Sequence, residues 1–286
     1  MAALENKMDF VMLFTAVGAN PNGDPLNGNM PRSDYDGYGE ISDVCIKRKI
    51  RNRMQDMGLS IFVQSNDRID DAKKSLEERF NSEFNSKDSD DKVYQAACEK
   101  WMDVRSFGQV MTFQKRSIGI RGPVSISLAK SLSPVDVISM QITRSTNGMI
   151  AKKESGRSSD TMGTKHYVEF GVYTVKGSIN TYFAEKTGFT TEDAEVIKEA
   201  LRTLFVNDSS SARPEGSMEV KQLYWFTHPS KLGVASSAKI QSLLEIKVKD
   251  DTIKPARYED YEIQLNKEKL AQLEKKGLRV EVIEGL

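Results

Sequence analysis

A nearly continuous apolar run lies close to the start of the chain, at residues 7–18 (KMDFVMLFTAVG). Strands that are buried on both faces have such unbroken apolar runs. Strands with one solvent-exposed face alternate apolar and polar positions instead. We therefore predict a central buried strand here. Residues 19–39 (ANPNGDPLNGNMPRSDYDGYG) are dense in Gly, Pro, Asn and Asp, which favours a long loop.

Residues 38–57 (YGEISDVCIKRKIRNRMQDM) show helical periodicity, with Ser42 or Asp43 as the expected N-cap. One narrow apolar stripe consists of Ile46, Ile50, Met54 and Met57. The cations lie around the rest of the helix, and no acid falls between Asp43 and Asp56 to neutralise them. A helix docked by one face and cationic on the other suits phosphate binding. A solvated surface helix is the alternative, and it is the better one for this helix considered alone.

Two charged segments with helical periodicity follow, at residues 68–84 and 91–101, joined by a hydrophilic hinge. With a short strand-like patch at 60–64, they predict a small helical insertion over about residues 61–101. The next segment, 103–114 (DVRSFGQVMTFQ), is predicted to be a strand interrupted at Ser106 and Gly108. In it Arg105 lies near Phe107 and Met111, a cation beside a stacking surface, which is typical of RNA sites. One exposed arginine at a strand end is the simpler alternative.

Strand-like patterns at 124–144 and 166–179 flank a polar, basic stretch, residues 145–164 (STNGMIAKKESGRSSDTMGT). This stretch is too long for an ordinary loop in a compact domain. Either it is disordered, or it is a protruding hairpin that orders on a partner. Its cations are Lys152, Lys153 and Arg157, and its sizeable apolar side chains are Met149, Ile150 and Met162.

The last third of the chain is predicted to contain both helices and strands. A helix is predicted at 191–205, capped by Thr190 or Thr191, with an apolar face of Ala194, Ile197, Leu201 and Leu204. A loop with the single cation Arg213 comes next (VNDSSSARPEGSM). Strands at 219–226, 243–249, 258–265 and 278–283 and a short helix at 266–276 complete the chain. We expect an α+β fold, a single ferredoxin-like, RRM-type domain over residues 1–286 with insertions.

The charge and the cysteine content exclude several classes of protein. Lys and Arg total 41, as do Asp and Glu, so a generally basic nucleic-acid binder is excluded but a protein with segregated charge is not. Cys45 and Cys98 are too few for a disulfide framework or a multi-cysteine metal site. With no signal peptide and no long apolar run, we expect a cytoplasmic protein without membrane contact.

Motifs for catalysis and cofactor binding are missing from the sequence. There is no P-loop, no dinucleotide fingerprint and no nucleophile elbow, and neither His166 nor His228 has a carboxylate or cysteine at metal-ligand spacing. Asp24, Asp34 and Asp36 of the first loop could hold a divalent metal, although acids in such loops more often close Asx-turns. We expect no cofactor, no metal and no enzymatic activity.

Several segments in their order along the chain carry a family resemblance. They are the first strand, the loop ANPNGDP, the basic helix, DVRSFGQVM, the stretch from ITRS to TMGTKHYVEFGVY, and NDSSSARPEG. Together they resemble the repeated backbone subunit of CRISPR Cascade in its type I-C form, the Cas-seven or Csd family. The resemblance spans nearly the whole chain, and its combination of segments is more specific than any one of them.

The resemblance implies an RRM-like palm, a finger-like helical insertion and a β-hairpin thumb at about residues 143–165. It implies that several copies assemble along one CRISPR RNA, beside other Cascade subunits, and present the guide for pairing with target DNA. The protein would hold the RNA backbone while base pairing selects the sequence. On this chain the implied RNA-binding residues are Asn20, Lys47, Arg48, Lys49, Arg51, Arg105, Ser106, Phe107, Gln109, Met111, Arg144, Met162, His166 and Arg213.

Two other functions remain open from the sequence. One is an RNA-cleaving subunit of the same superfamily that uses Asp24. The other is a ferredoxin-like protein that assembles with itself and binds no nucleic acid.

Overall fold

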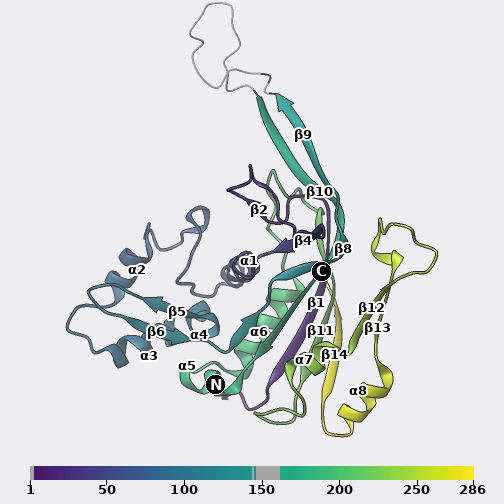
Figure 1. Ribbon diagram of the computed structural model, residues 1–286. Helices are drawn as coiled ribbons and strands as arrows, with labels where there is room; N and C mark the ends of the chain where they lie inside the picture. Colours follow the sequence, from purple (N-terminus) through teal and green to yellow (C-terminus); the bar gives the residue numbers. More distant parts are fainter. Residues whose placement is uncertain (1–2, 144, 146–161) are drawn as a thin grey trace, which may run out of the picture.

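The protein is described by a computed structural model that covers residues 3–143, 145 and 162–286 (Figure 1). Among these residues, eight strands form one antiparallel sheet. Six of them follow one another in the order β14 (Arg279–Glu284), β11 (Met218–Thr227), β1 (Met8–Ala19), β10 (Met162–Ile179), β8 (Ala129–Pro134) and β4 (Tyr38–Ile41). β10 also pairs with β7 (Val124–Ile126) and β9 (Val137–Thr143). The predicted central position of the first strand is confirmed.

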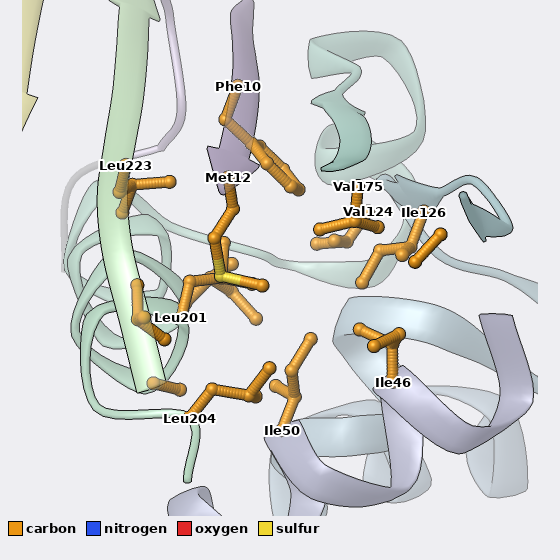
Figure 2. Packing of buried hydrophobic residues seen from close by; sticks show 14 of the residues in the cluster. Phe10, Met12, Ile46, Ile50, Val124, Ile126, Val175, Leu201, Leu204 and Leu223 are labelled. Atoms are coloured by element: carbon orange, nitrogen blue, oxygen red, sulfur yellow. The ribbon is translucent and has the colours of Figure 1, made fainter. Parts of the chain in front are cut away.

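Both faces of β1 are covered, which explains its unbroken apolar pattern. On one face Phe10 and Met12 pack against α1 (Asp43–Asp56) and α6 (Thr191–Arg202), as Figure 2 shows. On the other face Val11 and Leu13 are buried beneath C-terminal elements. These elements are α7 (Ser237–Gln241), β12 (Leu244–Val248), β13 (Tyr261–Leu265) and α8 (Lys267–Glu274).

The basic helix begins where its predicted N-cap places it. Residues 38–41, which the helical stretch 38–57 included, form strand β4 instead, which pairs with β8 and buries Ile41. Ser42 is the N-cap, because its hydroxyl accepts a hydrogen bond from the Cys45 N–H at 3.2 Å. The predicted apolar stripe is confirmed, with Ile46, Ile50 and Met54 fully buried.

A second apolar core lies beside the sheet and is built around Phe62, Phe80 and Trp101. Its elements are α2 (Leu76–Glu83), α3 (Asp90–Lys100), α4 (Met102–Phe107), β5 (Gly108–Met111) and β6 (Ile118–Arg121). This core reaches Ile120, so it includes elements beyond the segment predicted as the insertion, about residues 61–101.

Three local predictions in this region are wrong. Residues 60–64 form no strand, and residues 68–84 are helical only at η1 (Asn66–Arg68) and α2, since Ala72 has a positive φ and Ser75 starts α2 as its N-cap. The first half of the predicted strand 103–114 is helix α4. Gly108 ends that helix at φ 79° and its N–H bonds to the Val104 carbonyl, so the strand begins only there.

The pair β9–β10 continues beyond the sheet as a hairpin that projects away from the rest of the fold (Figure 1). Its register runs from Val137 opposite Val168 to Thr143 opposite Met162. β10 begins at Met162, whereas the strand was predicted to begin at residue 166, so that boundary is corrected. Residues 162–164 are part of the hairpin, which was one of the two alternatives for residues 145–164. The residues predicted to extend this arm, including Arg144, lie outside the described residues, as do Met149, Ile150, Lys152, Lys153 and Arg157.

The remaining predicted elements are present with small shifts at their ends. The α6 prediction is confirmed, with Thr190 as N-cap in a capping box with Asp193. Short elements escaped prediction because they hold too few residues for a period: β2 (Gly23–Asp24), β3 (Met30–Pro31), α5 (Thr181–Thr187), α7 and η3 (Tyr258–Asp260). Within the part of the chain that the structure describes, no helix has both the length and the apolar character that crossing a bilayer requires.

Candidate nucleic-acid interface

Three segments far apart in the sequence meet in a cluster that we call the loop junction: Asn20, Lys49, Asp208 and Arg213. Asp208 forms an ion pair with Lys49 of α1, and the Arg213 Nε lies 3.4 Å from the same Asp208 carboxylate oxygen. Arg213 also donates from Nη1 to the Asn20 carbonyl at 3.4 Å. Three residues predicted to bind RNA, Asn20, Lys49 and Arg213, are therefore brought together.

The loop junction lies at the base of the projecting hairpin. Ala19, the last residue of β1, is opposite Val168 of β10, which in turn is opposite Val137 of β9. Asn20 follows directly, and its side-chain amide donates to the Asn29 carbonyl at 2.7 Å. The two long loops thus meet where the hairpin leaves the sheet (Figure 1).

The loop junction is cationic and partly buried, with Asn20 and Lys49 inside the fold and Arg213 27% exposed. Lys49 is 3% exposed, and burial holds its pKa below the ordinary value, partly offset by the Asp208 carboxylate. Burial likewise raises the pKa of the neighbouring Cys45 thiol, although the Lys49 charge opposes that shift. Asn20 is 3% exposed, and its Oδ1 has no hydrogen-bond partner among the described residues. Lys49 was predicted to grip phosphate, but its charge is used inside the fold.

The cations of α1 do not form the uncompensated face that the sequence predicts. Lys47 pairs with Asp43 at 2.9 Å, and the Arg51 Nε donates to Asp103 at 2.8 Å. Arg53 contacts Thr203 and Asp56, each at 3.0 Å. The prediction failed because α1 is flanked on both sides by distant segments, which supply Asp103 and Asp208.

Arg48 differs from the other cations of α1, because its observed acceptor is a carbonyl. Its Nη1 donates to the Val63 carbonyl at 2.6 Å, and no ion pair involves it within the described residues. Burial lowers its pKa, and the nearby Arg51 charge adds to that effect. Of the predicted cations on α1, Arg48 is the one whose charge is left for a phosphate.

The predicted RNA surface over residues 105–111 is largely internal. The Arg105 guanidinium makes two 2.9 Å hydrogen bonds to the Asp193 carboxylate and so ties α4 to α6. Ser106 and Met111 are fully buried. Phe107 lies 5.0 Å beneath the Arg51 guanidinium, and the Gln109 amide donates to the Val110 carbonyl at 3.0 Å. The alternative of an exposed arginine at a strand end is wrong, because Arg105 lies in α4, pairs with Asp193 and is 15% exposed.

The hairpin carries the remaining predicted residues. His166 bonds through Nδ1 to the Ser139 hydroxyl at 2.8 Å, and Met162 is 60% exposed at the end of the described strand pair. Met140 and Ile142 on the neighbouring strand are also about half exposed. Met162 lies opposite Thr143, so it is on the other face of the hairpin from Met140 and Ile142. Exposed apolar side chains on both faces of a projecting hairpin suit contact with a partner.

A comparison with known protein families shows which family this chain belongs to. Residues 6–266 match the family model described as CRISPR-associated protein Cas7. The chain belongs to the Cas7 family. The Haloferax volcanii CRISPR-associated protein Cas7 is 26% identical over 210 residues, which cover 66% of this chain and 61% of that protein. The match therefore spans less than two thirds of that relative.

Two solved structures also resemble this Cas7-family chain at low identity. A chain described as "CRISPR RNA-guided surveillance complex, pre-nicking" has a TM-score of 0.48 at 13% identity, covering 77% of this chain and 78% of its own. Another, described as "CRISPR RNA-guided surveillance complex", has a TM-score of 0.46 at 15% identity, covering 77% and 68% respectively.

Acids in the first loop of this Cas7-family chain close turns, as the Asx-turn interpretation predicts. Asp24 accepts from the Leu26 N–H at 3.2 Å, and Asp34 accepts from the Asp36 and Tyr38 N–H groups. A hydrogen bond from Lys130 holds the pKa of Asp34 below its usual value. Within the described residues, no group of three or more His, Cys, Asp or Glu side chains is placed to hold a metal ion.

Sequence reasoning missed the acids that organise this Cas7-family site. Asp103, Asp193 and Asp208 each hold a predicted RNA-binding cation, yet none stands near that cation in the sequence. It also missed that the buried His228 bonds through Nε2 to the buried Asp9 at 2.8 Å, with Nδ1 accepting from the Val234 N–H. That pair gives His228, which directly follows β11, a structural role.

Proposed function

We propose that this chain is the CRISPR RNA-binding backbone subunit of a type I-C Cascade surveillance complex in the cytoplasm. Several copies assemble along one guide RNA, beside other Cascade subunits, and present the guide for pairing with target DNA in antiviral defence. The observation that carries this proposal is the match to the Cas7 family over residues 6–266.

The sheet supports a ferredoxin-like, RRM-type palm as the core of the proposed subunit. In chain order, α1 lies between β1 and β7, and α6 lies between β10 and β11. These four strands pair antiparallel in the spatial order β11-β1-β10-β7, with both helices packed on one face. That is the split β-α-β arrangement of the ferredoxin-like fold.

The hairpin β9–β10 suits the thumb of such a subunit. It projects beside the loop junction, and it exposes Met140, Ile142 and Met162. We propose that the hairpin contacts guide RNA and the next copy, while Arg48 and Arg213 face phosphates. Base pairing then selects the target, and the protein binds only backbone and shape. A chain with no net charge suffices, because each copy needs few free cations.

Shortening the hairpin tests this proposal. Deleting residues 139–166 and joining Ile138 to Tyr167, which face each other in the ladder, through an Asn-Gly turn keeps the base of the hairpin. We expect a folded protein that no longer forms regular assemblies on RNA. Electron microscopy and sedimentation of the protein mixed with a guide-length RNA measure the assembly.

The control for this deletion is Ile253→Ser, since Ile253 is fully exposed in the loop between β12 and β13 and lies outside the deleted segment. It should assemble as the unchanged protein does. Regular assembly of the shortened protein on RNA would refute the thumb assignment. Failure of the unchanged protein to bind any RNA would refute the proposed function itself.

We further propose that the subunit is a scaffold without nuclease activity. Asp24, the best candidate for a catalytic acid, bonds to Leu26 and to Arg32 at 3.3 Å. RNA and DNA incubated with the protein and magnesium or manganese should remain intact on a denaturing gel. Cleavage that disappears in Asp24→Ala would show instead an RNA-cleaving subunit.

A further inference from the structure

Four side chains on α5 and β6 form a surface that we call the aromatic–cation patch: Arg121, Tyr182, Phe183 and Lys186. The Arg121 guanidinium lies 4.2 Å from the centre of the Phe183 ring. The Lys186 Nζ lies 4.4 Å from the centre of the Tyr182 ring. The two rings meet edge to face with centres 5.5 Å apart. Two cation–π pairs thus stand side by side.

The aromatic–cation patch is open to solvent. Tyr182 is 60% exposed, although leaving an aromatic ring in contact with water is unfavourable. The neighbouring face of the β5–β6 hairpin is also bare, with Val110 61% exposed opposite Gly119. A Cβ added at Gly119 would meet no atom within 4 Å. The Tyr182 ring, Val110 on β5 and Gly119 on β6 are therefore all exposed to solvent.

The two cations of the patch are not neutralised inside the fold. Neither Arg121 nor Lys186 forms an ion pair in the described ranges of the chain. Glu185, the residue before Lys186 on α5, pairs with Lys231 instead. Arg105, Arg51 and Lys49 all have carboxylate partners. Arg121 and Lys186 thus keep their charges directly beside the exposed rings.

The patch is joined to the candidate interface through α4. The Thr187 hydroxyl of α5 donates to the Arg105 carbonyl at 2.9 Å, and Gly108 leads from α4 into β5. At the other side of α4, Phe107 lies under the Arg51 guanidinium of α1. Figure 1 shows α4, α5 and β6 together beside α1. The patch is therefore held in place by α4, the same helix that packs beneath Arg51 of α1.

We propose that the aromatic–cation patch binds a single-stranded segment of RNA, with one base stacked on Tyr182 and phosphates near Arg121 and Lys186. This inference rests on the proposed function and adds a second contact area to it. Bases in single strands stack on exposed aromatic rings, and nearby cations hold the backbone. A cation on one face of the ring leaves the other face for a base.

An acidic protein segment fits the patch less well than RNA. Carboxylates would pair with Arg121 and Lys186, but they would leave the Tyr182 ring in water. A purely apolar partner would bury the ring, but it would leave the two cations without partners. RNA uses both kinds of group at once.

The test uses the full-length chain and a fluorescein-labelled oligouridine, with binding followed by anisotropy. Tyr182→Ala should weaken binding about 5- to 150-fold, the effect of losing one stacked base. Tyr182→Phe is the matched control, because it keeps the ring, and it should bind as the unchanged protein does. Replacing Arg121 and Lys186 by Gln should each flatten the salt dependence by about 0.7 in slope.

The outcomes separate this inference from the proposed function. Oligouridine bound equally by Tyr182→Ala and the unchanged protein would overturn the patch and leave the proposed function standing. Oligothymidine bound in a Tyr182-dependent way, with oligouridine not bound, would overturn the assignment to RNA. Loss of self-association in Tyr182→Ala with unchanged RNA affinity would assign the patch to a protein contact instead. Unfolding midpoints of all variants should match, since Tyr182 is largely exposed.

Discussion

Replacing Arg51 by alanine is expected to lower the free energy of unfolding by about 3–5 kcal/mol, the effect of breaking a buried ion pair. Its partner Asp103 is fully buried and accepts three hydrogen bonds. One comes from the Arg51 Nε at 2.8 Å and two come from the backbone N–H groups of Phe62 and Val63. Without Arg51, the buried Asp103 carboxylate loses its only ion-pair partner among the described residues.

Urea denaturation followed by circular dichroism measures this effect, and Lys47→Ala is the matched control on the same helix. Lys47 is a partly exposed cation that pairs with Asp43 one turn away. Its loss should change stability by only about 0.3–0.5 kcal/mol. Equal losses in the two variants would show that Asp103 does not depend on Arg51.

The same contact limits how RNA binding can be tested on α1. A double substitution of Arg48 and Arg51 would weaken RNA binding partly by destabilising the fold. Arg48 donates to a backbone carbonyl and leaves no buried carboxylate behind when it is removed. Arg48→Ala alone is therefore the suitable probe of phosphate contact.

Asp208→Ala should also destabilise the protein, by about 3–5 kcal/mol at pH 7. The substitution leaves Lys49 buried on α1 without its carboxylate partner, and Arg213 loses the same anchor. Thermal and urea unfolding measure the change. Glu215→Ala, an exposed position in the same loop, should stay within about 0.5 kcal/mol of the unchanged protein.

The Asp208→Ala effect should depend on pH in a direction that Lys49 sets. Burial holds the pKa of Lys49 below the unfolded value of 10.5, so the unfolded chain binds the proton more tightly. Between the lowered pKa and 10.5, the free energy of unfolding therefore rises with pH. Removing Asp208 lowers this pKa further and starts that rise at a lower pH.

The loss of stability caused by Asp208→Ala should consequently shrink between pH 7 and pH 9.5, because a neutral lysine needs no partner. Unfolding the variant and the unchanged protein at both values checks this expectation. A stability difference that stays constant over this range would contradict a buried, charged Lys49 as its cause.

Local pattern in the sequence was sufficient for much of the fold. The unbroken apolar run identified β1 as a central strand, because burial on both faces leaves no position for polar residues. The stripes on α1 and α6 were correct for a similar reason, since each helix docks on one face of the sheet. Periodicity could not locate β4, α4 or α5, because elements of four to seven residues hold too few turns or alternations.

By itself, the sequence determined which cations this protein carries and placed the basic run on the helix α1. Only the tertiary structure decided which of those cations are free. Asp103, Asp193 and Asp208 reach Arg51, Arg105 and Lys49 across 52, 88 and 159 residues of chain. A buried charge needs a partner, and the partner is chosen by proximity in space, which no local pattern records. Tyr182, Arg121 and Lys186 stayed exposed because no such segment folds over them.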